Sequence, residues 1–324
     1  MSHIRLIFII IGFLFNSIVQ AQLIDPTNTY NAVSGDRYFR FSYDNDYFTK
    51  TDNYYTQGIN IEYVHPVLQK FPLTGLLAKL PGSNYKYGLS IDLAGYTPTS
   101  IAADHILYGD RPYAASLTLK TFKISTDAVH KRQLSTSLIL GVLGQFALGQ
   151  EIQTGIHKGL NNPLPMGWQF QIKNDIIMNY QVNYEKRIWN AGKGLQIGAA
   201  AEARLGTFQQ KLGAGFTIMA GHFNDPYEYI VGRKSGKKLQ YYFFGHPFIN
   251  LIGYDGTLQG GLFNRKSPYT IGAADISRLV FQGDAGITIS TRRLYLSYCQ
   301  SLMTKEFSTG KYHRWGGVRF GIAF

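Results

Sequence analysis

Several features of soluble secreted enzymes are missing from this sequence. Cys299 is its only cysteine, so no intramolecular disulfide can form and an exported chain must rely on packing or closed hydrogen bonding. Charged residues make up only 16% of the 324 residues. No GxSxG elbow occurs and no Cys and His residues have zinc spacing, which argues against a serine triad and a structural zinc site.

A long hydrophobic run is missing as well. Residues 6–15 are apolar and follow Arg5, but a membrane-spanning helix needs roughly 20 residues. The run leads to the small-residue sequence that ends at Ala21, which is typical of a secretory signal peptide. We therefore predict a signal peptide over residues 1–21 and one domain over residues 22–324.

Aromatic residues and positive charge are abundant. The chain has 23 Tyr, 21 Phe and 35 Gly, and its formal net charge is +12. Tyr suits a membrane interface because its ring is apolar and its hydroxyl is polar. The positive charge favours an anionic partner, for which phosphorylated lipid is more natural than nucleic acid in an exported protein. The composition indicates an outer-membrane barrel.

Apolar and polar residues alternate with a period of two through most of the chain, as lipid-facing and lumen-facing positions do in a transmembrane barrel. A secreted β-sandwich would alternate too, but twelve strands and a terminal Phe324 favour an all-β, twelve-stranded antiparallel barrel. The predicted strands are 38–46, 54–65, 86–97, 114–125, 133–145, 175–188, 194–206, 211–222, 239–254, 278–290, 293–303 and 313–324.

The first connection predicted on the outer side concentrates oxygen-bearing side chains. It holds Asp44, Asn45, Asp46 and Asp52, and Thr56 opens the next strand. Carboxylate and amide oxygens suit calcium, although Asp and Asn also form ordinary hairpin turns. The residues alone leave both interpretations open.

Two further outer connections carry candidate groups. Arg111 in GDRPYA could bind a lipid phosphate or cap its loop. Residues 148–160 predict a short helix that places Gln153 and His157 on one face, where a neutral His could act as general base on water. We expect Trp168 to anchor this loop at the membrane interface.

The motifs DNDYF, TDNYYTQG, YTP, GDRPYA and GQEIQTGIH with GWQFQIKN occur in this order over residues 38–175. Together they resemble the outer-membrane lipid A 3′-O-deacylases and their relatives. The resemblance implies a calcium-dependent site at the outer leaflet that hydrolyses the ester of the 3′-linked acyloxyacyl chain of lipid A.

The resemblance also implies residue roles. His157 would activate water, Asn45 and Asp46 would hold calcium or orient other groups, and Thr56 with Gln153 would complete the site, where Thr56 helps to stabilise the oxyanion. Arg111 would bind substrate. The expected protein is a monomer in the outer membrane that binds lipopolysaccharide.

One position departs from the family pattern. Six residues beyond His157, where characterised enzymes carry Glu, this chain has Pro163. Calcium binding would then draw on Asp44, Asp52 or Glu151, or the activity would have changed. A phospholipid ester is the nearest alternative substrate. The rival class is a non-catalytic barrel, either a channel or a lipid-binding relative.

Overall fold

The computed structural model describes residues 25–49, 54–192, 194–228 and 237–324. The predicted signal peptide and Asp52 lie outside these residues. Among the described residues, no helix has the length and apolar character needed to cross a membrane.

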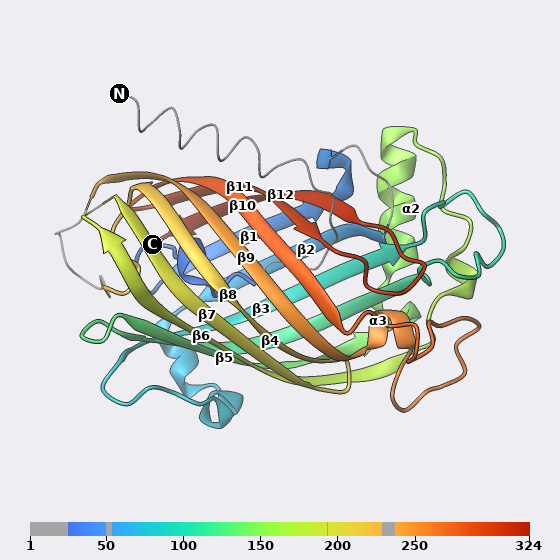
Figure 1. Cartoon of the computed structure of the whole chain (residues 1–324), viewed down its shortest axis with the longest axis horizontal. Helices are drawn as coiled ribbons and strands as arrows, with labels where there is room; N and C mark the ends of the chain where they lie inside the picture. Colours follow the sequence, from blue (N-terminus) through green and yellow to red (C-terminus); the bar gives the residue numbers. More distant parts are fainter. Residues whose placement is uncertain (1–24, 50–53, 193, 229–236) are drawn as a thin grey trace.

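Twelve antiparallel strands form a closed barrel in the described chain, as predicted (Figure 1). Each strand pairs with its sequence neighbours, and β1 closes the barrel on β12 with Tyr38 opposite Ala323. The largest difference from prediction is the end of β6, expected at 188 and observed at Ala191. The strands are β1 (Tyr38–Asn45), β2 (Tyr54–Val64), β3 (Asn84–Thr97), β4 (Ala114–Asp127), β5 (Arg132–Leu143), β6 (Asp175–Ala191), β7 (Leu195–Gly206), β8 (Gln209–His222), β9 (Leu239–Asp255), β10 (Leu279–Thr291), β11 (Leu294–Met303) and β12 (His313–Ala323).

The two faces of the wall differ as the alternation predicts. In β1, Arg40 and Ser42 are buried, whereas Phe39 and Phe41 are exposed on the other face. Arg40 makes an ion pair with Glu62 at 2.8 Å inside the barrel. Polar residues therefore face the lumen and apolar residues face lipid.

Short helical elements lie mainly in the connections. The predicted helix over 148–160 is confirmed as α2, which spans Gly149–Leu160. Long connections with α2 and α3 gather at one end of the barrel (Figure 1). The other end has the short turns between β4 and β5 and between β10 and β11, and it also carries the longer connection with η3 and η4. The remaining elements are η1 (Thr29–Asn31), η2 (Asp46–Thr49), η3 (Pro66–Lys70), η4 (Pro72–Leu76), η5 (Gln145–Ala147), η6 (Trp168–Phe170) and α3 (Gly256–Gln259).

The segment before β1 fills the lumen towards the end with short turns. Thr29 donates from its backbone and its hydroxyl to Glu185, at 2.8 and 2.6 Å. Arg40 donates to the carbonyl oxygen of Asn31 at 2.6 Å, and the Tyr30 ring stacks on Phe244. Residues 27–31 are therefore bonded to the inner wall on several sides.

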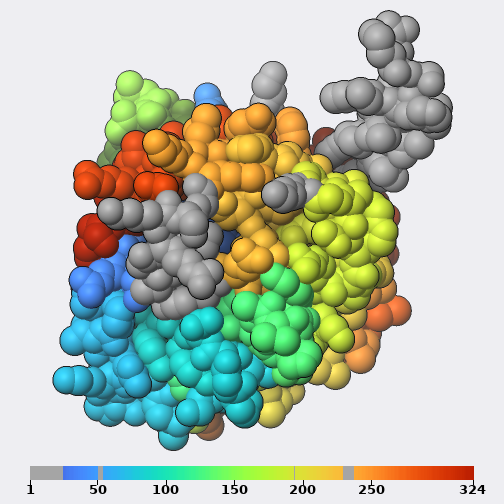
Figure 2. All heavy atoms as spheres, turned by 90° about the vertical axis from the view of Figure 1, so that its left-hand side faces the viewer, coloured from blue at the N-terminus to red at the C-terminus, as the bar shows by residue number. Residues whose placement is uncertain are grey.

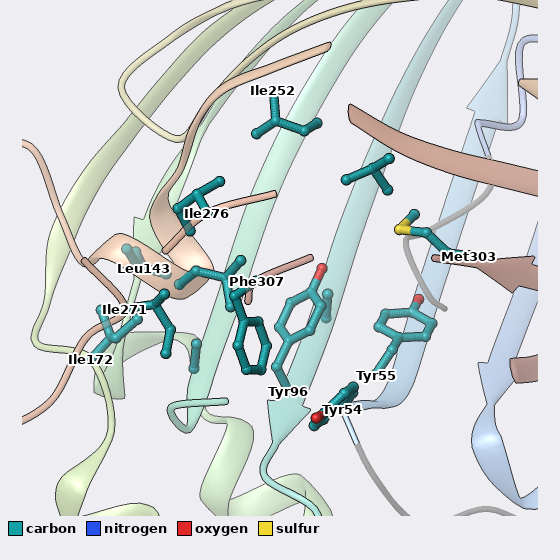
Figure 3. Close-up of a cluster of buried hydrophobic side chains, with 14 of the residues drawn as sticks. Tyr54, Tyr55, Tyr96, Leu143, Ile172, Ile252, Ile271, Ile276, Met303 and Phe307 are labelled. Carbon is teal, nitrogen blue, oxygen red and sulfur yellow. The ribbon is translucent and has the colours of Figure 1, made fainter. Parts of the chain in front are cut away.

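A cluster of buried hydrophobic side chains closes the end with long connections (Figure 3). Tyr55 and Tyr96 come from the wall, and Ile271, Ile276 and Phe307 come from the connections. A polar cavity of about 80 Å³, lined by Asp92, Lys120 and Arg204 among others, lies in the lumen. The segment at residues 27–31 and this cluster therefore occupy the lumen on either side of the cavity.

Candidate active site between the barrel wall and a loop helix

A β-bulge prepares the first part of the site. Tyr55 pairs with Tyr96 and Gln57 pairs with Gly95, so Thr56 is the extra residue that has no partner on β3. A bulge frees a backbone group from the ladder and redirects a side chain, and bulges are frequent beside active sites. The bulge makes both the carbonyl and the hydroxyl of Thr56 available to other elements.

The side chain of Asn45 forms a hydrogen bond with the Thr56 carbonyl. Its Nδ2 donates to the Thr56 carbonyl oxygen at 2.7 Å and to the Tyr43 hydroxyl at 3.1 Å. Its Oδ1 accepts from the backbone N–H of Tyr47 at 2.8 Å. Asn45 therefore fixes the ends of β1 and β2 relative to the following turn, on the lipid-facing side that Tyr43 shares.

Asp46 follows Asn45 directly in the chain. It opens η2 and is 2% exposed. Its carbonyl oxygen accepts from the Thr49 hydroxyl at 2.8 Å, and that hydroxyl also donates to the carbonyl of Arg314 on β12. The turn that carries Asp46 is thus attached to the barrel seam.

Helix α2 lies against the outside of the wall. A Cβ added to Gly149 would meet the Cβ of Ala115 at 2.5 Å and the Trp168 ring at 2.8 Å, so only glycine allows this approach. Ala115 lies on the outward face, because its neighbours Ser116 and Thr118 line the lumen cavity. The site therefore forms between α2 and the outer wall, at the rim of the barrel.

Gln153 connects α2 to the bulge. Its Oε1 accepts from the Trp168 indole N–H at 2.7 Å, and its Nε2 donates to the Thr56 hydroxyl at 3.2 Å. An indole N–H only donates, so it fixes which end of the amide faces Thr56. Because the Thr56 oxygen accepts from Gln153, its own O–H can donate to another oxygen.

His157 lies one turn further along the same buried face of α2. Its Nδ1 is 2.6 Å from the carbonyl oxygen of Pro163. A carbonyl oxygen only accepts, so Nδ1 carries the proton and Nε2 of the neutral ring has a free lone pair. The residue that lacks the expected carboxylate therefore orients His157 through its backbone.

Hydrogen bonds join three of the predicted site residues into one connected set, since Asn45 and Gln153 both bond to Thr56. Asp46 and His157 are related to this set by their places in the chain, directly after Asn45 and on the helix that carries Gln153.

Arg111 belongs to a different environment. It is 2% exposed, its guanidinium donates to Glu306 and to the Thr257 hydroxyl, and it lies 4.4 Å from the centre of the Tyr96 ring. Burial raises the pKa of Glu306 to about 7, and the positive charge of Arg111 opposes that rise. These contacts place Arg111 at the closed mouth of the barrel, and no described contact joins it to the connected set.

Sequence reasoning missed two contributors. Trp168 was expected at the membrane interface, but this prediction was wrong, because its ring is 1% exposed and packs on Tyr113 at 5.0 Å. A buried indole needs an acceptor, and the nearby glutamines were the available signal. The second contributor is the carbonyl of Pro163, which has no sequence signal because every residue has a carbonyl.

Calcium prefers carboxylate, amide, hydroxyl and carbonyl oxygens, and the predicted ligands can be checked against that preference. Asp46 supplies one buried carboxylate, to which amide, hydroxyl and carbonyl oxygens can be added. Asp44 instead faces Arg319 at 3.4 Å in the lumen, and Glu151 is exposed. The described residues contain no group of three or more His, Cys, Asp or Glu side chains that could hold a metal.

Comparisons with known proteins identify the family of the barrel. The family model "Outer membrane protein LpxR" matches residues 7–324. The solved structure of LpxR from Salmonella typhimurium has a TM-score of 0.70 and 21% identity, over 89% of this chain and 100% of that chain. The β domain of the Bordetella autotransporter BrkA is more distant, with a TM-score of 0.46 and 8% identity over 90% of this chain and 100% of that chain. No curated protein matches in sequence. The family model covers nearly the whole of a closed twelve-stranded barrel, and the chain therefore belongs to the LpxR family of outer-membrane proteins.

Proposed function

We propose that this protein is an outer-membrane esterase that removes the 3′-linked acyloxyacyl chain from lipid A. Family membership supports the hydrolase class, and the position of the site between α2 and the lipid-facing wall suits a lipid substrate. The observation that carries the proposal is the contact of His157 Nδ1 with the Pro163 carbonyl at 2.6 Å, since it leaves Nε2 as a base.

In the proposed reaction His157 Nε2 accepts a proton from water while the water oxygen attacks the ester carbonyl carbon. The resulting tetrahedral oxyanion collapses and breaks the bond to the sugar oxygen, which takes the proton back from His157. The products are a fatty acid and a free sugar hydroxyl. A positioned general base typically contributes about 10²–10⁴-fold in rate.

The Thr56 hydroxyl is the donor that we assign to the oxyanion. Its oxygen accepts from Gln153, so its proton points elsewhere. One preorganised donor contributes about 3 kcal/mol to such a transition state. Asn45 contributes indirectly, because it holds the carbonyl of the same residue.

Calcium is part of the proposal as a cofactor. Asp46 would hold it, with Asn45 as a neutral oxygen donor. When bound, calcium supplies positive charge that polarises an ester carbonyl. With one carboxylate the expected dissociation constant is about 10⁻⁴–10⁻³ M.

Mass spectrometry of lipid A tests the activity. The purified protein in detergent with calcium is expected to remove the 3′-linked acyloxyacyl chain, and His157→Asn is expected to lose this product. His105→Asn is the matched control, because His105 is exposed and lies outside the connected set. Unchanged lipid A with the unsubstituted protein, under conditions where a known deacylase acts, would refute the proposal.

Release of a fatty acid from phospholipid instead of lipid A would assign the activity to the nearest alternative substrate. A passive channel finds no support in the described lumen, which residues 27–31 and the outer hydrophobic cluster fill. We expect the protein to act as a monomer.

A further inference from the structure

We infer that the periplasmic rim carries a binding site for an anionic phospholipid of the inner leaflet, in an open groove between the β10–β11 turn and the start of β9. This site is independent of the proposed esterase. The β10–β11 turn lies at the end of the barrel opposite α2 and α3, which faces the viewer in Figure 2 (Figures 1 and 2). Outer-membrane barrels place their short turns in the periplasm, so the groove is expected at the phospholipid leaflet.

The groove combines positive charge with an apolar floor. It has a volume of about 580 Å³ and is lined by Lys238, Thr291, Arg292, Arg293, Leu294 and Ile322. Three of its six lining residues are cations, and Lys238 and Arg293 have no ion pair among the residues that the structure describes. A phosphate group is the anion that such a cluster suits at a membrane surface.

The floor of the groove continues along the barrel wall. Leu294 lies opposite Ile322 in the β11–β12 register, and both side chains are exposed, by 46% and 41%. The next outward-facing pair is Leu296 opposite Phe320, and it is exposed as well. An acyl chain can lie along these pairs while its headgroup remains at the arginines.

The backbone of the turn is well fixed. The hydroxyl of Thr291 accepts from the backbone N–H groups of Arg293 and Leu294, at 3.2 and 3.0 Å. The Arg293 carbonyl accepts from the N–H of Ala323 at 2.7 Å. These bonds hold the backbone of the turn beside the start of β11 and the end of β12, so both arginines extend from a fixed point.

The chemistry therefore selects a lipid that has both a phosphate with net negative charge and an acyl chain. Phosphatidylglycerol satisfies both conditions. Phosphatidylcholine has the same chains but no net charge, and glycerol phosphate has the charge but no chain. Comparison of these three probes separates the contribution of the phosphate from that of the acyl chain.

Native mass spectrometry of the full protein in detergent tests the inference. Dimyristoyl phosphatidylglycerol is expected to bind more tightly than dimyristoyl phosphatidylcholine, and glycerol phosphate is expected not to be retained. Each cation near an anionic lipid contributes about fivefold in binding, so Arg292→Gln with Arg293→Gln should weaken phosphatidylglycerol binding about 30-fold. Binding of phosphatidylcholine should not change.

Two controls accompany this variant. Arg265→Gln with Lys266→Gln removes the same charge from an exposed loop at the other end of the barrel and should keep the lipid preference. The variant with Arg292→Lys and Arg293→Lys keeps both charges and should still bind phosphatidylglycerol. It shows whether the glutamine variant loses binding through its charge or through a folding defect. Equal loss in both glutamine variants would overturn the site, as would retention of glycerol phosphate as strong as that of the lipid.

Discussion

The Nδ1 atom of His157 lies 2.6 Å from the carbonyl oxygen of Pro163, six residues further along the chain. In many hydrolases a carboxylate orients the catalytic His, and it also stabilises the imidazolium that forms. A backbone carbonyl orients the ring equally well but carries no full negative charge. The chain therefore retains the geometry of a base while it lacks one negative charge beside it.

Restoring that charge should strengthen calcium binding. We predict that Pro163→Glu, which places a carboxylate at the family position, lowers the calcium concentration for half-maximal deacylation by about tenfold, because affinity rises with ligand charge. Pro163→Ala is the control, since it keeps the carbonyl and adds no charge. Titration of calcium in a deacylation assay gives both values, and identical curves for the two variants would contradict the prediction.

The indole of Trp168 should act through Gln153. Trp168→Phe removes the N–H donor but keeps a ring that can pack on Tyr113, so the amide can rotate away from Thr56. We expect kcat to fall about tenfold, in line with the loss of one oriented hydrogen bond, with little change in KM.

Trp189→Phe is the control for this substitution, because Trp189 is exposed on the lipid-facing side. A double substitution with Gln153→Leu should cost little more than Gln153→Leu alone, because both changes act on the same hydroxyl. Additive losses would show that Trp168 acts only by packing.

Replacement of two different glycines of α2 by alanine should have opposite effects on stability. A Cβ at Gly149 would lie 2.5 Å from the Cβ of Ala115, whereas a Cβ at Gly155 would have no heavy atom within 4 Å. Gly149→Ala should push the helix from the wall at a cost of about 1–3 kcal/mol and reduce deacylation. Gly155→Ala should stabilise the helix by about 1 kcal/mol and leave activity intact. Limited proteolysis of the loop measures the stability of the helix, and the deacylation rate measures activity. Equal effects of the two substitutions would contradict the close approach of Gly149 to Ala115.

The stability of the folded protein should depend on pH through Glu306, which lies at the closed mouth of the barrel. Burial raises the pKa of this carboxyl to about 7 against an ordinary value of 4.5, although Arg111 opposes the rise. The folded protein therefore binds this proton more tightly than the unfolded chain, so the stabilising contribution is complete below pH 4.5. It is lost as the pH rises through 7.

Thermal unfolding from pH 4.5 to 8.5 tests this prediction. Glu306→Gln cannot ionise, so its melting temperature should rise relative to that of the unsubstituted protein as the pH increases. Glu151→Gln is the control, since Glu151 is exposed. Parallel pH curves for the unsubstituted protein and Glu306→Gln would contradict the assignment.

Much of this architecture could be predicted because a barrel repeats one rule in every strand. Inward residues such as Arg40 are polar and outward residues such as Phe41 are apolar, so the strands can be found one by one. The helix of Gln153 and His157 could be predicted for a similar reason, since its buried face follows the helical period.

Pairings between distant segments could not be predicted in this way. Glu306 is 195 residues from Arg111, and its role in neutralising that guanidinium depends on barrel closure. The bulge at Thr56 depends on the register of two strands rather than on its own sequence. The contact of the Pro163 carbonyl depends on how the chain leaves α2, where Asn161 adopts a left-handed conformation.

The segment at residues 27–31 has a consequence for the polar groups of the inner wall. It is enclosed by the wall and bonded to Arg40, Glu185 and Tyr242, which lie on three separate strands. Deletion of residues 27–31 would leave the buried Glu185 carboxylate and the Tyr242 hydroxyl without these partners. The chain before β1 therefore serves the barrel as part of its interior.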